Sequence, residues 1–172
     1  MARNIEIKAR IESIESLAVV AAALANEGPL EIDQDDTFFF CEAGRLKLRA
    51  FSSTSGELIF YRRANQYGPK ESFYVRSPSS DPELLREALT LAYGQAGRVQ
   101  KHRTVFMVGR TRVHLDRVQD LGNFLELEVV LDDSEPAEVG VLEATELMGK
   151  LGVQQHQLLE EAYVDLLAQK GA

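Results

Sequence analysis

The sequence is poor in the residues that build several common kinds of functional site. Its single cysteine, Cys41, excludes an internal disulfide and suits a reducing compartment. Cys41 and the three scattered histidines do not have the spacing of a zinc site. No Gly-x-x-x-x-Gly-Lys-Ser/Thr string occurs, so a phosphate-cradling P-loop is excluded.

Long apolar runs and an excess of positive charge are also missing. No apolar stretch approaches the length of a membrane span, and we see no signal peptide, so we expect a cytoplasmic protein without membrane contact. The formal net charge of −8 argues against a nucleic-acid partner, which would need a broad basic surface. The 172 residues favour one domain, 1–172, with a substantial core.

The residues that are present predict a strand-rich fold. Alternation and turn residues predict strands over residues 2–11, 30–41, 45–51, 57–64, 70–77, 98–108, 110–118 and 124–132. Helical spacing and capping residues predict helices over 13–27, with Gly28 as its C′ glycine, and over 82–95, 136–151 and 154–169. Most connections between strands have hairpin length, which indicates an antiparallel sheet. We therefore expect an α+β, mainly β fold: a closed antiparallel barrel of about eight strands with flanking helices.

Charged side chains recur at i, i+2 spacing in five stretches, mostly with apolar residues between them. The stretches are Glu6–Lys8, Arg45–Lys47–Arg49, Lys101–Arg103, His114–Asp116 and Glu126–Glu128. This spacing places the charges on one face of a strand. A solvated sheet face is the ordinary explanation. The separation of cations and acids onto different strands favours instead a barrel interior that attracts an anion.

Taken in order, these stretches resemble the CYTH family, named for class IV adenylate cyclases and thiamine triphosphatases, and its bacterial adenylate-cyclase-like branch. The family's ExExK signature reads Asn4-Ile-Glu6-Ile-Lys8 here, with Asn in place of the first Glu. The later strands match in turn: Arg45-Leu-Lys47-Leu-Arg49, Lys101-His-Arg103, His114-Leu-Asp116 and Glu126-Leu-Glu128. Tyr61-Arg62-Arg63 resembles a further basic position, and alternation with Tyr61 favours Arg63 over Arg62.

The resemblance implies an eight-stranded barrel called the triphosphate tunnel, which acts on a triphosphate-containing small molecule with Mg²⁺ or Mn²⁺. It implies metal ligands at Glu6, Glu126 and Glu128, with Asp116 as a further candidate. It implies triphosphate contacts at Lys8, Arg45, Lys47, Arg49, Arg63, Lys101 and Arg103. Lys8, Lys47 and Lys101 are also catalytic candidates, through their charge or as a base with a depressed pKa. Asn4 offers a neutral oxygen where the family has a carboxylate, which could lower metal affinity.

Three functions remain open at this point. The first is a metal-dependent hydrolase of an inorganic or organic triphosphate, which we favour because we identify no base-specific motif. The second is a class IV adenylate cyclase that forms cyclic AMP and pyrophosphate, and the third is a non-catalytic polyphosphate- or nucleotide-binding module. A homodimer is compatible with each. His114 is expected to be a wall residue more than a base, and Tyr163 could close one mouth of the tunnel.

Overall fold

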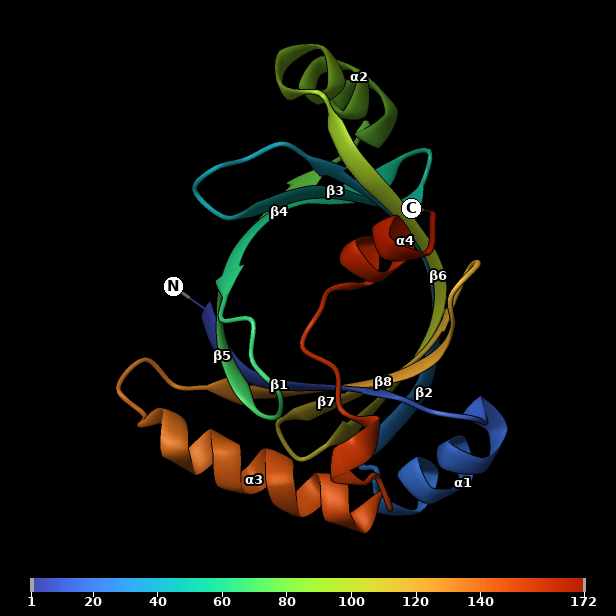
Figure 1. Cartoon of the computed structure of the whole chain (residues 1–172), viewed down its shortest axis with the longest axis vertical. Helices are drawn as coiled ribbons and strands as arrows, with labels where there is room; N and C mark the ends of the chain where they lie inside the picture. The colour runs from blue at the N-terminus through green and yellow to red at the C-terminus, as the bar shows by residue number, and fades with distance from the viewer. Residues whose placement is uncertain (1, 172) are drawn as a thin grey trace.

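The computed structural model describes residues 2–171, which form a closed antiparallel barrel flanked by helices (Figure 1). Eight strands lie within these residues: β1 (Ala2–Arg10), β2 (Glu27–Phe39), β3 (Arg45–Ser52), β4 (Ser55–Arg63), β5 (Lys70–Ser79), β6 (Gln95–Val108), β7 (Thr111–Val118) and β8 (Gly122–Leu131). Their order around the barrel is β1-β5-β4-β3-β2-β6-β7-β8. The predicted mainly β barrel with helices around it is confirmed.

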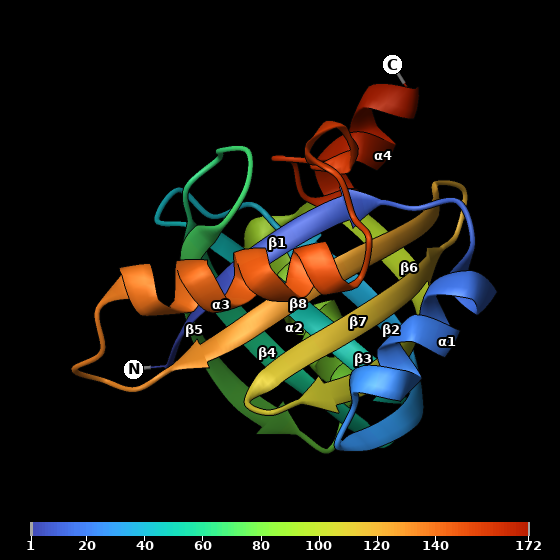
Figure 2. The same ribbon diagram turned by 90° about the horizontal axis from the view of Figure 1, so that it is seen from below.

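The hydrophobic core lies outside the barrel wall rather than within it. Helices α1 (Ile14–Leu24) and α3 (Ala137–Lys150) cover the outer face of β1, β7 and β8 (Figure 2). Along β8, Leu125, Leu127 and Val129 point into this outer core, and the acids between them point into the barrel. Period-2 alternation thus buries the leucines under helices and leaves the charged face for the interior.

Helix α2 (Pro82–Tyr93) connects β5 to β6 and packs on the opposite side of the barrel, over β2, β3 and β4 (Figure 1). Asp81 caps it, since its side chain accepts a hydrogen bond from the Leu84 backbone, as expected of an acid just before a first-turn proline. Between Ala2 and Gly171 no helix has the length and apolar character needed to cross a membrane.

The prediction of one helix over residues 154–169 is wrong. This region contains a single turn of 3₁₀ helix, η1 (Gln155–Gln157), an extended segment, and then α4 (Tyr163–Gly171). Leu158 packs into the outer core, whereas Tyr163 and Val164 pack into a second apolar cluster at one end of the barrel. The extended segment between them lets the chain reach both apolar clusters. Val164 needs Gly97 beneath it, because a Cβ there would lie 2.5 Å from Val164 Cγ2.

Two other predicted boundaries are also wrong. Gly28 does not close the first helix; it lies inside β2, which is longer than predicted because it pairs with β6 from Glu27 onward. Gly28 has a φ of +106°, and a Cβ on it would lie 2.6 Å from the Val105 carbonyl oxygen. The strand predicted over 98–108 begins earlier, at Gln95, so Gly97 lies within β6. Gly28 permits close approach between β2 and β6, and Gly97 permits close approach of α4 to β6. A glycine after a helical pattern resembles a helix end in the sequence, so this requirement could not be recognised there.

Candidate active site

The barrel encloses a cavity of about 450 Å³, lined by inward side chains from strands all around the wall. A volume of this size is typical of small-molecule sites. Nine of the residues singled out from the sequence line it: Glu6, Lys8, Lys47, Arg49, Arg63, Lys101, Arg103, Glu126 and Glu128. Charged residues that share the inward face of their strands, although far apart in the sequence, therefore line one cavity.

Two of the predicted site residues lie elsewhere. Arg45 is half exposed at the rim, where its Nη2 donates to Asp165 Oδ2 at 2.6 Å. Asp116 is fully buried behind Arg103. Arg62 points away from the cavity and donates to the Ala43 carbonyl, so Arg63 is the inward member of its pair.

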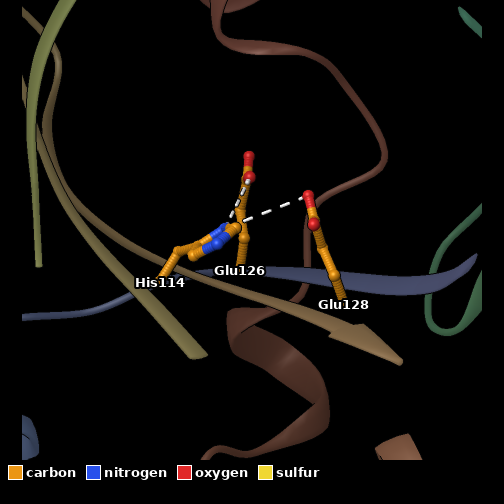
Figure 3. A group of neighbouring side chains, drawn as sticks. All are labelled: His114, Glu126 and Glu128. Carbon is orange, nitrogen blue, oxygen red and sulfur yellow. Dashed lines mark ion pairs between the residues drawn. The ribbon is translucent and has the colours of Figure 1, made fainter. Parts of the chain in front are cut away.

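One group of side chains in the cavity has the chemistry of a metal site: His114 of β7 with Glu126 and Glu128 of β8 (Figure 3). Their ligand atoms lie within 4.8 Å of one another. His114 Nδ1 is 3.9 Å from Glu126 Oε2 and 3.9 Å from Glu128 Oε1. This nitrogen is buried and has no hydrogen-bond partner among residues 2–171. Buried polar atoms normally have partners, so the unsatisfied nitrogen indicates room for a ligand between the three groups.

The protonation states of this group also suit a cation. Burial and the charge of Arg103 lower the pKa of His114, so the imidazole is neutral at pH 7, the form that binds metal. Burial opposes ionisation of Glu128, but the charges of His114 and Arg112 lower its pKa to about 2. Since His114 is itself neutral at pH 7, Arg112, whose Nη2 lies 2.8 Å from Glu128 Oε2, is the partner that keeps Glu128 ionised there. Two carboxylates and an imidazole fit Mn²⁺ well and Mg²⁺ through the carboxylates.

Glu126 is shared between the acidic group and the cations. Its Oε1 lies 3.1 Å from Lys8 Nζ, and its Oε2 accepts a hydrogen bond from Arg103 Nη2 at 2.9 Å. Burial opposes its ionisation, but Lys8 and Arg103 hold its pKa well below the usual range. Lys8 and Arg103 therefore link the cationic side chains of the cavity directly to Glu126, one of the proposed metal ligands.

The other predicted metal ligands are engaged differently. Glu6 lies opposite Glu128 in the β1–β8 register, and its carboxylate accepts a hydrogen bond from Arg63 at 2.9 Å. Asp116 accepts two hydrogen bonds from Arg103, each 2.7 Å, and one from the Tyr163 hydroxyl at 2.8 Å, so it acts as an anchor behind the cavity. Asn4 Oδ1, in place of the family's first glutamate, is buried without a hydrogen-bond partner in the described part of the chain.

A second buried carboxylate, Asp36 of β2, was not identified from the sequence. Asp36 is 1% exposed and accepts hydrogen bonds from Arg49 Nε at 2.8 Å and Arg49 Nη2 at 2.7 Å. Lys47 Nζ and Lys101 Nζ lie 3.0 Å and 3.4 Å from the same carboxylate. Asp36 and Asp116 thus hold Arg49 and Arg103 in fixed bidentate pairs. Asp36 lies two residues before Phe38 in the same strand, so both side chains face inward. This spacing was the signal in the sequence that could have identified Asp36.

The cations around Asp36 have altered pKa values. Burial, with the charges of Arg49 and Arg103, lowers the pKa of Lys101 to about 7 despite the attraction of Asp36. Burial also lowers the pKa of Lys47. Burial opposes ionisation of Asp36, but Arg49, Lys101 and Lys47 keep its pKa well below the usual range. The cluster is therefore cationic, and Lys101 exchanges its proton near neutral pH.

One end of the cavity is closed by the segment that leads into α4, which crosses the opening of the ring in Figure 1. Lys8 Nζ donates to the Glu161 carbonyl at 3.3 Å and lies 3.9 Å from the centre of the Tyr163 ring. Lys70, a buried lysine that sequence analysis missed, donates to the Glu160 carbonyl at 3.0 Å. Burial lowers the pKa of Lys70 to about 8. The cavity therefore opens mainly at the end remote from α4.

Comparison with known proteins agrees with this geometry. A family model described as the CYTH domain matches residues 2–163. The adenylate cyclase CyaB of Aeromonas hydrophila is 25% identical over 174 residues, covering 96% of this chain and 89% of that protein. The PH1012 protein of Pyrococcus horikoshii OT3 superposes with a TM-score of 0.83 at 22% identity, over 95% of this chain and 98% of that one.

A putative adenylate cyclase from Vibrio parahaemolyticus superposes with a TM-score of 0.77 at 15% identity, covering 96% of this chain and 97% of that one. A putative adenylyl cyclase from Hippeastrum, described as having a dominant triphosphatase activity, superposes with a TM-score of 0.65 at 19% identity, over 98% and 96% of the two chains. These structures share the barrel. Because the domain model spans almost the whole chain, the protein belongs to the CYTH family.

Proposed function

We propose that the chain is a divalent-metal-dependent phosphohydrolase that acts on a triphosphate bound in the barrel cavity. The observation that carries the proposal is the junction at Glu126, where the acidic group with His114 meets the cationic wall through Lys8 and Arg103. Phosphoryl transfer needs positioning and charge neutralisation more than a covalent nucleophile. A site that combines metal ligands and fixed cations within one chamber meets both needs.

The contacts of these residues indicate a different role for each group. Arg49 and Arg103 are held rigid by Asp36 and Asp116, so each presents its guanidinium in a fixed direction to phosphate oxygens. Lys8 and Lys47 supply point charges, and Lys101 can exchange a proton near neutral pH with the attacking water. His114, Glu126 and Glu128 would hold Mg²⁺ or Mn²⁺, with Glu6 close by. Held there, such an ion would neutralise charge on the phosphate oxygens and would lower the pKa of a water that it binds.

Adenylate cyclase activity is the second candidate, because the CyaB relative covers nearly the whole of both chains. Cyclisation uses the same phosphate and metal groups but needs the ribose hydroxyl in line with the α-phosphorus. A non-catalytic module that binds polyphosphate would use the cations alone.

Product analysis distinguishes these functions. The protein is incubated with Mg²⁺ or Mn²⁺ and ATP, thiamine triphosphate or tripolyphosphate, and the products are separated by chromatography. We expect orthophosphate and a diphosphate, with turnover lost in Glu126→Gln. Glu31→Gln, on the outer face of β2 beside His102, is the matched control and should keep full activity. Cyclic AMP with pyrophosphate would favour the cyclase, and binding without any product would favour the module.

A further inference from the structure

The side chain of Tyr163 lies where the C-terminal segment meets the cations of the cavity. Tyr163 is the first residue of α4, is 5% exposed and lines the cavity. Its ring packs on Phe124, with the two ring centres 4.9 Å apart. It also reaches three of the cations predicted to bind triphosphate, two through its ring and one through its hydroxyl. Excluding water from this end requires only apolar bulk, so these polar contacts need a separate explanation.

The ring of Tyr163 faces two lysines. Lys8 Nζ lies 3.9 Å from the ring centre, and Lys101 Nζ lies 5.4 Å from it. An ammonium group within about 6 Å of an aromatic ring is attracted by the negative charge on the face of the ring. Burial opposes the charged form of both lysines, because it lowers the pKa of each. The ring therefore favours the charged form and restricts the directions in which the two lysines point.

The hydroxyl of Tyr163 acts on Arg103 through Asp116. It donates to Asp116 Oδ2 at 2.8 Å, and the same oxygen accepts from Arg103 Nη2 at 2.7 Å. Asp116 is fully buried, so these contacts and not water set the direction of its carboxylate. The bond from Tyr163 therefore fixes the carboxylate that orients the Arg103 guanidinium.

The chain on either side of Tyr163 is fastened to the barrel. Before it, the Leu159 amide donates to the Lys8 carbonyl at 2.9 Å. After it, Asp165 Oδ2 accepts from Arg45 Nη2 at 2.6 Å. A side chain holds its neighbours in place only when its own position is fixed by packing and hydrogen bonds. Tyr163 meets this requirement, because its backbone is tied to β1 and β3 and its ring is buried.

Lys47 shows the same arrangement built from the barrel alone. Its Nζ lies 5.5 Å from the centres of both the Phe38 and the Tyr61 rings, which belong to β2 and β4. Each of the three lysines predicted to act on the triphosphate thus faces an aromatic ring. For Lys8 and Lys101 the ring comes from α4 instead of a barrel strand, so their geometry depends on the C-terminal segment.

We propose that Tyr163 is a positioning residue for triphosphate binding. Its ring and its hydroxyl hold Lys8, Lys101 and Arg103 in the directions that meet the phosphates. The first turn of α4 is therefore part of the active site, in addition to closing one end of the cavity. The inference rests on the proposed function, because these cations are the ones proposed there to bind phosphate.

Two substitutions at Tyr163 separate the ring from the hydroxyl. Tyr163→Phe keeps the ring and removes the bond to Asp116, whereas Tyr163→Leu removes both. Isothermal titration calorimetry with tripolyphosphate, in EDTA and again with Ca²⁺, measures the Kd of each protein. We expect Kd to rise about threefold in Tyr163→Phe and about tenfold in Tyr163→Leu. The smaller effect of the phenylalanine is the partial rescue expected if the ring acts separately from the hydroxyl.

Val164→Ala is the matched control for a loss of packing. Val164 is buried beside Tyr163 in the same apolar cluster. Within residues 2–171 it packs on Gly97 and does not line the cavity. The substitution should lower Tm by a few degrees and leave Kd within about twofold of wild type. A loss of folded protein reduces the number of sites that calorimetry counts but not their affinity, so Kd separates positioning from stability.

The possible results separate the two proposals. An unchanged Kd in Tyr163→Leu, or an equal rise of Kd in Val164→Ala, would overturn the positioning role while leaving a triphosphate site intact. If Tyr163→Leu does not fold, Tyr163→Phe decides, and an unchanged Kd there would overturn the role. Failure of the wild type to bind tripolyphosphate in both buffers would overturn the proposed function as well.

Discussion

Replacing Asp36 by Asn should destabilise the protein and make its stability depend strongly on a polyanion. Asp36 is buried and is the shared partner of Arg49, Lys47 and Lys101. Asn has a similar shape but no charge, so the substitution removes the anion and leaves three cations close together. Removing one partner of a buried ion pair is costly because the remaining charge is buried without compensation.

The expected loss follows from this environment. Breaking a buried ion pair typically costs about 3–5 kcal/mol. Lys101, whose pKa is already lowered to about 7, can shed its proton and limit the loss, so we expect the lower end of that range. For a domain of this size each kcal/mol lowers Tm by about 2–4 °C, which gives a fall of roughly 6–12 °C. Tripolyphosphate should restore much of this, because its charge replaces that of Asp36 beside the same cations.

Thermal unfolding with and without millimolar tripolyphosphate measures both effects. The rise in Tm caused by the ligand should be larger in Asp36→Asn than in the wild type. Asp33→Asn is the matched control: Asp33 lies on the same strand but is 84% exposed and contacts His102 outside the barrel, so its Tm should hardly change. A Tm for Asp36→Asn within about 2 °C of wild type, or an equal ligand-induced rise in both proteins, would refute the reasoning.

Three other measurements examine the site. Glu126→Gln and Glu128→Gln should each lower turnover at least about 100-fold while the far-UV spectrum stays unchanged, and full activity in EDTA would contradict the metal assignment. Lys47→Ala should weaken tripolyphosphate binding much more than Arg45→Ala, because Arg45 pairs with Asp165 at the rim; equal effects by calorimetry would show that the rim belongs to the site. Burial lowers the folded-state pKa of Lys101 to about 7. Between pH 7 and pH 10 the unfolded chain therefore binds more protons at this lysine than the folded chain does. Lys101 thus makes the free energy of unfolding rise with pH over this range. Tripolyphosphate should favour the protonated lysine, so calorimetry at pH 8 in buffers of different ionisation enthalpy should report proton uptake that is smaller in Lys101→Met.

Alternation along the chain determined which residues face the interior. The pattern at Glu126–Glu128 and at Lys101–Arg103 placed these charges on one face, and the same pattern placed Leu125 and Leu127 in the core under the helices. A side-chain period of two is a local property of a strand, so it can be read without knowing the strand's neighbours. The order of the charged doublets was enough to identify the family and its barrel.

The pairing of these charges was decided by tertiary structure. Asp116 shares its strand and its parity with His114, yet it anchors Arg103, whereas His114 joins Glu126 and Glu128. Alternation predicts which face of its strand each residue lies on, but not the register between separate strands. The position of Asp36 between Arg49 and Lys101 therefore could not be predicted from the sequence.

The ends of the cavity depended on tertiary structure for the same reason. Arg45 follows the alternation of Lys47 and Arg49 but lies one step too far along β3, at the rim. Residues 154–169 have helical spacing, but Leu158 and Tyr163 fill separate apolar clusters, and the chain between them is extended to reach both. Packing against distant strands outweighs local helix propensity here. This packing closes one end of the tunnel and leaves the other end open.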